Sequence, residues 1–510
     1  MVIDTRALAP GRELRYDVCI VGAGAAGITL ARALKSEHRS IGLLESGGFD
    51  FENSTQALYG GTTEATGLNP GRYLSASRLR FFGGTTNHWA GMCRHLDPLD
   101  FAVRPWVPNS GWPIGLDDLA PYYTQAAGIL QFRPFDERWG DVTLRPDSIV
   151  PPGGALIGRT FRYSPPTRFG RVYRGELVEA KTIDVLLHAN VVHIDVNEGG
   201  TAVERLQVAT LGRKRLTVRA PLFVLATGGI ENARLLLVSN SVHKAGLGNA
   251  CDCVGRFFME HPERTAAYLA ITSRVVLEDI RMLRRSRAML CLSEEAQRTH
   301  ELLNANIDLG AMGTLRESPA GGVPLAIRDT LNRVDSLGSG EPANEDPSRS
   351  QAYTRCFIRA EASPRRESRV TLEDRETDAL GLRRPRLTFV MDTLESRTFV
   401  RTMEIVAREL GARQGGRVML RLAEEAVNIP IAGPLWGGVG GGNHHIGTTR
   451  MSDQSGDGVV DRHCLVHGVS NLYVAGSSVF PTGGMANPTF TIVALALRMA
   501  DHIDARLGGL

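Results

Sequence analysis

The sequence predicts an α/β fold in which both ends of the chain contribute strands to one doubly wound parallel sheet. An apolar run at residues 16–21 leads through a glycine-rich turn into an apolar helical pattern. Residues 219–238 repeat this order of strand and helix, and residues 471–506 repeat it near the C-terminus. Strands that alternate with helices favour a parallel sheet with helices on both faces, and the residues between these units are expected to form an inserted second unit.

The composition is that of an ordinary globular protein. Of the 510 residues, 43% are hydrophobic and 22% charged, which excludes a disordered chain or a collagen. A net charge of +3 over this length is too small to favour nucleic acid or an anionic membrane as a partner. A run of about 18 apolar residues is missing, so no membrane span is expected.

Cysteine usage and the N-terminus bear on the compartment. The seven cysteines are scattered and lack the spacing of a metal site, so free thiols and no bound metal are expected. The first residues lack the apolar core of a signal peptide, which predicts a cytoplasmic protein. The strong preference for arginine over lysine indicates a bacterial source with a GC-rich genome.

The first strand and helix carry a nucleotide-binding pattern at residues 22–27, which read Gly-Ala-Gly-Ala-Ala-Gly. Gly22 permits the tight turn, Gly24 lets the backbone approach a pyrophosphate, and Gly27 lets the helix pack close to the strand. Glu45 ends the next strand, where its carboxylate can accept hydrogen bonds from ribose hydroxyls and would repel the 2′-phosphate of NADP. The pattern predicts binding of FAD or NAD, and the alternative is a tight turn without a ligand.

Four further segments combine glycines with histidine, asparagine or threonine. They are residues 82–89 (FGGTTNHW), 254–262 (VGRFFMEHP), 444–451 (HHIGTTRM) and 484–491 (GMANPTFT). With the N-terminal unit and residues 474–481 (VAGSSVFP), their order along the chain resembles the glucose–methanol–choline (GMC) oxidoreductases. The pairing of HxxGT with NPT is most similar to pyranose oxidases and to bacterial sugar or glycoside dehydrogenases.

The resemblance implies FAD as the cofactor, rather than NAD, and a division into two domains. Residues 1–264 and 441–510 are expected to form a discontinuous FAD-binding domain with a Rossmann-like doubly wound sheet. Part of 95–165 is expected to cover the flavin. Residues 265–440 are expected to form an α+β substrate-binding domain with an antiparallel sheet.

Three stretches within the expected substrate domain can be interpreted individually. Residues 369–373 and 386–391 alternate between apolar and polar side chains as strands do, and a helical pattern covers residues 393–410. Residues 336–350, rich in glycine, proline and serine, are expected to form a loop, either over the entrance to the site or elsewhere on the surface.

The resemblance implies oxidation of an alcohol, which needs a base for the hydroxyl proton while hydride leaves the same carbon for flavin N5. Histidine suits the base because its ordinary pKa is about 6.5. His444 holds the first position of HxxGT, where the family's catalytic histidine stands. Asn487 holds the partner position in NPT and cannot act as a base, so its amide is expected to bind the substrate oxygen. His445 points in a different direction from its neighbour and is expected to be a core or supporting histidine.

His88 stands where some relatives attach FAD covalently to the 8α-methyl carbon of the flavin. The alternative is a non-covalent contact near the dimethylbenzene edge. The other cofactor contacts that the resemblance implies, or that flank the glycine turn and Glu45, are spread over the chain. They are Ala26, Ser46, Gly83, Gly84, Asn87, Trp89, Ala90, Val192, Ala226, Gly228, Gly476, Pro488 and Thr489.

Three functions remain open from the sequence. The first is FAD-dependent oxidation of CH–OH to a carbonyl in a sugar, glycoside or polyol. The second is the same chemistry on an aminoglycoside-like biosynthetic intermediate or a simple alcohol. The third is a lyase or decarboxylase on the same fold. The chain has neither a CxxCH haem motif nor an iron–sulfur cysteine cluster, so O₂, a quinone or another redox protein is expected to accept the electrons.

Overall fold

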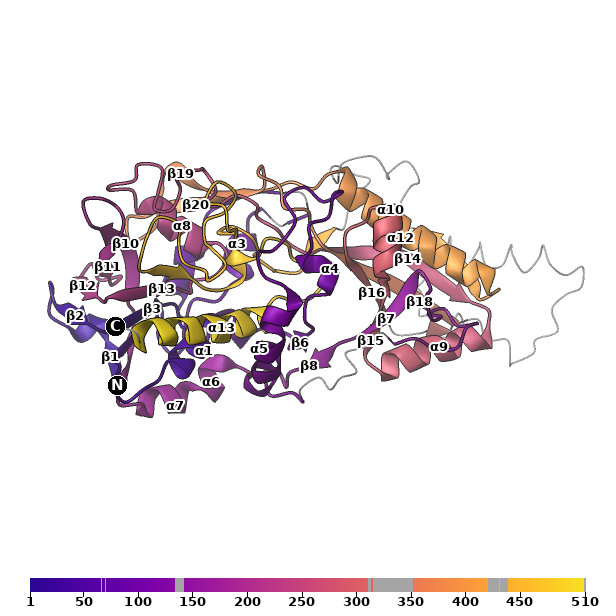
Figure 1. The fold of residues 1–510 in the computed structure, drawn as a ribbon, viewed down its shortest axis with the longest axis horizontal. Helices are drawn as coiled ribbons and strands as arrows, with labels where there is room; N and C mark the ends of the chain where they lie inside the picture. The colour runs from indigo at the N-terminus through magenta and orange to yellow at the C-terminus, as the bar shows by residue number, and fades with distance from the viewer. Residues whose placement is uncertain are drawn as a thin grey trace, which may run out of the picture.

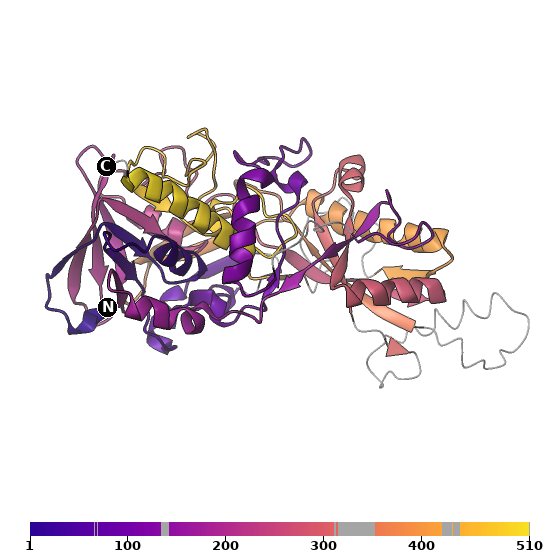
Figure 2. The same cartoon turned by 60° about the horizontal axis from the view of Figure 1, so that its bottom comes forward.

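The computed structural model describes residues 1–65, 67–68, 70–133, 142–310, 313–314, 352–420, 431 and 439–508. These form an elongated molecule with two lobes, and both termini lie in the same lobe (Figure 1). Viewed from a second direction, the lobes remain distinct and are joined by a waist (Figure 2). The predicted loop at residues 336–350 lies outside the described residues.

The lobe with the termini is built on a six-stranded, fully parallel sheet, which confirms the predicted fold class. Its order is β1 (Val2–Asp4), β9 (Ile183–Leu187), β4 (Ile41–Leu44), β3 (Val18–Val21), β13 (Leu222–Leu225) and β23 (Leu472–Val474). The strands β3, β4, β13 and β23 are buried along their whole length. Burial on both faces explains why they are continuous apolar runs rather than alternating ones.

Helices and a second sheet cover the two faces of this sheet. Helix α1 (Ala25–Ala33) packs on β3 and β4, and α13 (Thr489–Gly508) packs on α1 and on α5 (Leu116–Ile129). Helix α8 (Glu231–Val238) lies on the opposite side, against β10 (Figure 1). The second sheet has the order β10 (Asn190–Val196), β11 (Val203–Ala209), β12 (Arg215–Arg219) and β2 (Glu13–Arg15).

The other lobe is built on an antiparallel sheet, again as predicted. Its path is β21 (Gly416–Leu420), β14 (Pro262–Ile271), β18 (Ala352–Ala360), β16 (Ala305–Leu309), β15 (Ala288–Leu292) and β7 (Leu156–Thr160), with β17 (Gly313–Thr314) on β18 and β22 (Gly440–Gly441) on β14. Among its described residues, this lobe carries the helices α9 (Arg274–Arg285), α10 (Glu294–His300) and α12 (Thr393–Ala412). An Asp392 N-cap with Glu395 at the third position starts α12 as a capping box.

The strands predicted within residues 369–391 form, but in a sheet of their own. β19 (Arg369–Thr377) pairs with β20 (Arg383–Phe389), which in turn pairs in parallel with β5 (Thr62–Ala65). The short element α3 (Tyr73–Ala76) packs beside β5 in the lobe with the termini. The short helix α4 (Pro98–Phe101) and the strand pair β6 (Met92–Cys93) and β8 (Arg162–Tyr163) lie toward the other lobe (Figure 1). Within the described ranges, none of the helices combines the length and the apolar character that a bilayer span requires.

Candidate active site

A cavity of about 540 Å³ opens along the carboxyl edge of the parallel sheet. Gly22, Glu45 and Ala226 line it, and each directly follows a strand of that sheet. Gly476, two residues beyond β23, lines it as well. In doubly wound folds ligands bind outside the carboxyl ends of the strands, and the cavity has the size of an ordinary cofactor site.

The glycines of this edge leave room for a dinucleotide. At Gly24, Gly228 and Gly476 an added Cβ would meet no atom within 4 Å, so each backbone faces open space in the cavity. Gly24 also caps α1, whose free N–H groups and positive dipole end suit a pyrophosphate. Gly27 has another role, because a Cβ there would lie 1.9 Å from the carbonyl oxygen of Gly22. The residues present therefore fit FAD.

Glu45 holds the turn as well as facing the cavity. Its carboxylate accepts hydrogen bonds from the backbone N–H of Ala23 at 3.0 Å and of Gly47 at 2.9 Å. Burial raises the pKa of Glu45, while these backbone donors work in the opposite direction. A carboxylate has about four acceptor positions, so ribose hydroxyls can still bind.

Most of the sequence-predicted cofactor residues meet at this cavity. Those on its wall are Gly22, Gly24, Ala26, Glu45, Ser46, Gly84, His88, Trp89, Ala90, Ala226, Gly228, Gly476, Pro488 and Thr489. Four others, all within the described ranges, do not line it: Gly27, Gly83, Asn87 and Val192. Val191 lines the cavity next to Val192, because successive residues of β10 face opposite sides of the sheet. The Asn87 amide instead donates to the Phe82 carbonyl at 3.0 Å and closes the turn.

His444 and Asn487, predicted from separate motifs, lie side by side on the cavity wall. The Asn487 amide nitrogen is 3.2 Å from Nε2 of His444. On its other side, Nδ1 of His444 is 2.7 Å from Nδ1 of His261. Arg359 on β18 also lines the cavity, and its Nη1 is 3.4 Å from Oδ1 of Asn487. Glu263 binds Arg359 at 2.8 Å.

Neither His261 nor Arg359 was identified from the sequence as a functional residue. His261 belongs to the segment VGRFFMEHP, which was used only for the resemblance, so a signal was present at that position. Arg359 is one arginine among many in a strand, and no local pattern distinguishes it.

The environment keeps His444 neutral at neutral pH. Burial lowers the pKa of His444 well below its usual 6.5, and His261, Arg359 and His445 act in the same direction. Burial, with Arg359, also lowers the pKa of His261 to about 4. A neutral imidazole is the form that can take a proton from an alcohol.

His445 lies on the same wall but is held by different groups. Its Nε2 is 3.1 Å from the Ser77 hydroxyl, and its ring packs edge-on against Tyr73. Burial lowers the pKa of His445 to about 3, with Arg78 adding to the effect. The ring is therefore a neutral partner in the wall of the cavity.

Glu260 joins the segment of His444 to the segment of His261. One of its carboxylate oxygens accepts from the backbone N–H of both histidines, each at 2.8 Å. The other oxygen accepts from the Tyr73 hydroxyl. Burial raises the pKa of Glu260 to about 7. The two histidines are thus held together through their backbones as well as through their rings.

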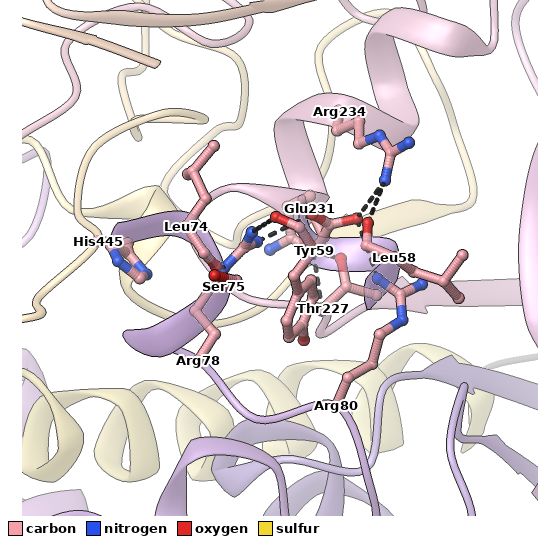
Figure 3. A network of polar contacts seen from close by, with 12 residues as sticks. Leu58, Tyr59, Leu74, Ser75, Arg78, Arg80, Thr227, Glu231, Arg234 and His445 are labelled. Carbon is pink, nitrogen blue, oxygen red and sulfur yellow. Dashed lines mark hydrogen bonds and ion pairs between the residues drawn. The ribbon is translucent and has the colours of Figure 1, made fainter. Parts of the chain in front are cut away.

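A charged cluster stiffens another part of the wall (Figure 3). Glu231 on α8 binds Arg78 at 2.9 Å, Arg80 at 3.3 Å and Arg234 at 3.2 Å. Burial opposes ionisation of Glu231, but the three arginines outweigh it and lower its pKa to about 2. Arg234 also binds Asp378, so the cluster ties α8 to the segment between β19 and β20.

His88 lies on the wall beside a loop that Arg168 holds. Arg168 donates to the carbonyls of Thr86 at 3.0 Å and of Trp89 at 2.7 Å. The Trp89 indole donates to the Thr167 carbonyl at 2.9 Å. Burial lowers the pKa of His88, and the charge of Arg168 acts in the same direction.

Comparison with known proteins agrees with this architecture. Residues 364–496 match the family model described as GMC oxidoreductase, and residues 17–242 match the model described as FAD dependent oxidoreductase. A 2-methyl-1,2-propanediol dehydrogenase of Mycolicibacterium austroafricanum is 25% identical over 83% of this chain and 80% of its own. A fructose dehydrogenase large subunit of Gluconobacter japonicus is 24% identical over 96% and 98%. A paromamine 6'-oxidase of Streptomyces fradiae is 24% identical over 96% and 92%.

Proposed function

We propose that the chain is a GMC oxidoreductase, an FAD-dependent enzyme that oxidises an alcohol, and that its substrate is a neutral sugar, glycoside or polyol. One observation carries the proposal. His444 and Asn487, which lie 43 positions apart in the chain, meet on the wall of the cavity that fits FAD. They supply a proton acceptor and an amide donor at one place.

In the proposed reaction, Nε2 of His444 takes the hydroxyl proton. The Asn487 amide donates a hydrogen bond to the hydroxyl oxygen and stabilises the negative charge that develops on it. FAD, when bound, supplies the acceptor of the hydride at its N5 atom. The O–H and C–H bonds of one carbon break, a C=O bond forms, and two electrons leave with the hydride.

Arg359 and Glu263 support a neutral, hydroxylated substrate. They form an ion pair whose side chains are 16% and 21% exposed, and Arg359 is the member that lines the cavity. Its guanidinium can donate to the hydroxyl groups of a neutral substrate. The ammonium groups of an aminoglycoside would meet this guanidinium close to His444, and like charges repel. The aminoglycoside alternative is therefore the less favoured one, although a paromamine oxidase is among the similar proteins.

We propose residues 1–264 and 441–510 as the FAD-binding domain and residues 265–440 as the substrate-binding domain. The parallel sheet, which is built only from residues of the first set, supports this division, and most strands of the antiparallel sheet come from the second set. β7 (Leu156–Thr160) joins the antiparallel sheet from the first set, and β20 of the second set pairs with β5 of the first. We also propose the predicted wall residues, from Gly22 to Thr489, as the cofactor contacts. For His88 we propose a non-covalent contact with FAD. Acid precipitation tests it, because a yellow supernatant means free FAD and a yellow pellet means a covalent bond.

We also propose an electron acceptor and a cellular compartment. We propose a dehydrogenase with weak oxidase activity that passes electrons to a quinone or another redox protein. All seven cysteines are free thiols in the structure, which supports a reducing compartment such as the cytoplasm.

Anaerobic flavin reduction tests the function. The purified enzyme is mixed without oxygen with fructose, a glycoside, a 1,2-diol or paromamine, and the flavin absorption near about 450 nm is followed. Bleaching by the neutral compounds is expected. Reduction by paromamine alone would replace the proposed substrate class with the aminoglycosides. Product formation with an unchanged flavin spectrum would instead point to a lyase or decarboxylase.

A further inference from the structure

The base proposed above must present a lone pair to the substrate. A neutral histidine carries one N–H and one unprotonated ring nitrogen, and the partners of each nitrogen decide which is which. For His444 both ring nitrogens have a partner in the structure. Each of these partners has a further partner, the Gly484 carbonyl or the Arg359 guanidinium. These two outer groups fix the direction of every hydrogen bond in the row.

On the His261 side, a carbonyl group fixes the direction of the hydrogen bonds. Nε2 of His261 is 2.7 Å from the carbonyl oxygen of Gly484, which can only accept. Nε2 of His261 therefore carries the hydrogen. Because His261 is neutral in its buried position, its Nδ1 has a lone pair. Nδ1 of His444, 2.7 Å away, must then be the donor.

On the Asn487 side, a guanidinium group fixes the direction of the hydrogen bonds. Arg359 has only donors, so the atom of the Asn487 amide that faces it is the oxygen. The amide nitrogen of Asn487 therefore faces Nε2 of His444, at 3.2 Å. An amide nitrogen only donates, so Nε2 of His444 must be unprotonated. The Gly484 carbonyl at one end of this row of hydrogen bonds and the Arg359 guanidinium at the other end therefore require, independently, the same tautomer of His444.

We propose that His261 is a positioning residue that holds His444 in the Nδ1–H tautomer. The Nε2 lone pair, which accepts from the Asn487 amide in the structure, is then available to a substrate hydroxyl that displaces this amide N–H. This inference rests on the proposed role of His444 as the base. When Nε2 takes the substrate proton, the Nδ1–H bond to His261 becomes charge-assisted and strengthens. His261 thus orients the base before the reaction and stabilises its cation during it.

The acceptor of His261 is itself rigid. Gly484 has a φ of +55°, and a Cβ there would lie 2.4 Å from a carboxylate oxygen of Asp100. Its N–H donates to Glu361 at 3.2 Å, and Glu361 pairs with Arg104 at 2.7 Å, with both side chains fully buried. Glu361 thus fixes the segment whose carbonyl determines the tautomer of His261.

Two variants of His261 separate the proposal from a purely structural role. In His261→Asn, the amide oxygen branches from the same carbon as histidine Nδ1 and can accept from His444. In His261→Gln, the longer amide can reach the Gly484 carbonyl but offers no acceptor at the δ position. The proposal expects His261→Asn to keep kcat within about threefold and His261→Gln to lose on the order of 10–100-fold, part of the roughly 10²–10⁴-fold that a positioned base contributes. KM is expected to change little in either variant.

The order of the two variants decides the outcome. If His261 only anchors Gly484, the Gln variant keeps activity and the Asn variant loses it, which would overturn the proposal. Equal activities of the two variants would also overturn it. The FAD content of each variant is measured by absorbance, so that loss of cofactor is not mistaken for loss of catalysis.

A neutron diffraction map of the wild-type enzyme tests the tautomer without any assay. We expect deuterons on Nδ1 of His444 and on Nε2 of His261, and none on Nε2 of His444. A deuteron on Nε2 of His444 would overturn the inference. If instead the map is as expected and no alcohol reduces the flavin, the proposed function fails while the hydrogen-bond chain stands.

Discussion

The carboxyl edge of the parallel sheet and the pair His261 and His444 lie in one active site but are built in different ways. At the sheet edge, Gly22 and Ala226 contribute mainly backbone, and their neighbourhood is set by strands that pair along their whole length. At the histidine pair, side chains from four separate segments converge. A site made of backbone needs short local patterns, whereas a site made of side chains needs the whole fold to bring them together.

The histidine pair is expected to show the largest effect. His444→Ala removes the proton acceptor, so kcat should fall by roughly 10²–10⁴-fold. The FAD content should not change, because the sheet edge is untouched. Stopped-flow measurement of flavin reduction, with the absorbance ratio of flavin to protein, checks both statements.

His445→Ala is the matched control for that variant. Its ring is bound to Ser77 and packed against Tyr73, so most of the turnover should remain. Should His445→Ala lose the activity and His444→Ala keep it, the assignment of the two neighbours would be reversed.

The charged cluster around Glu231 tests whether the sheet edge also depends on side chains. Glu231→Gln leaves three arginines, of which Arg78 and Arg234 are buried, without their shared counter-charge, and breaking buried ion pairs costs roughly 3–5 kcal/mol. The pKa of Glu231 is about 2 when folded against 4.5 unfolded, so its contribution is complete above the unfolded value. It is lost as the pH falls from 4.5 toward 2. Urea unfolding across that range should show the two proteins converging.

A surface pair provides the control for this loss. Glu294 binds Arg298 one helical turn away, and both side chains are 49% exposed. Glu294→Gln should cost only about 0.3–0.5 kcal/mol, because solvent screens the pair. Equal losses in the two variants would mean that burial of the Glu231 cluster adds nothing.

The features that could be predicted from the sequence are those built from backbone, and the features that could not are those built from converging side chains. The parallel sheet, the glycine turn at residues 22–27 and Glu45 were predicted, because a strand, a turn and a helix of fixed length suffice to define them. Helix α12 was predicted over residues 393–410 and extends to Ala412. The strands within residues 369–391 were also predicted, but not that they would pair with β5, because strand pairing is a long-range contact.

The residues that position the base are the ones that sequence patterns did not reveal. His444 and Asn487 were found only because a family resemblance places them in known motifs. Arg359 lies one residue before the end of β18, where no local sequence pattern distinguishes it from an ordinary strand residue. Its role exists only once the Asn487 amide, 128 positions away, lies within reach of its guanidinium.

Variants of two glycines in one turn separate binding of FAD at the sheet edge from stability of the fold. A valine at Gly24 would project into the open cavity, so Gly24→Val should abolish FAD binding while leaving the stability of the apoprotein nearly unchanged. An alanine at Gly27 would collide with the Gly22 carbonyl, so Gly27→Ala should destabilise the apoprotein by about 1–3 kcal/mol. Thermal unfolding of apoproteins and FAD titration separate the two. Loss of apoprotein stability in Gly24→Val would contradict the cavity-facing position of that residue.

The smallest expected effect concerns Arg359, which belongs to the second lobe but acts on the histidine pair. Its charge adds to burial in lowering the pKa of His444, together with His261 and His445, so the wild-type rate of flavin reduction should stay level from pH 8 down to below 6.5 and fall only in more acidic solution. Arg359→Met removes that charge and leaves Glu263 nearby, which should raise the pKa of His444 and move the acidic fall to higher pH. Arg359→Lys keeps the charge and should shift the profile less, with a few-fold difference between the variants near pH 6. If both profiles coincide with that of the wild type, burial and the two neighbouring histidines set the pKa of His444 without Arg359, and Arg359 serves the base only through the orientation of the Asn487 amide.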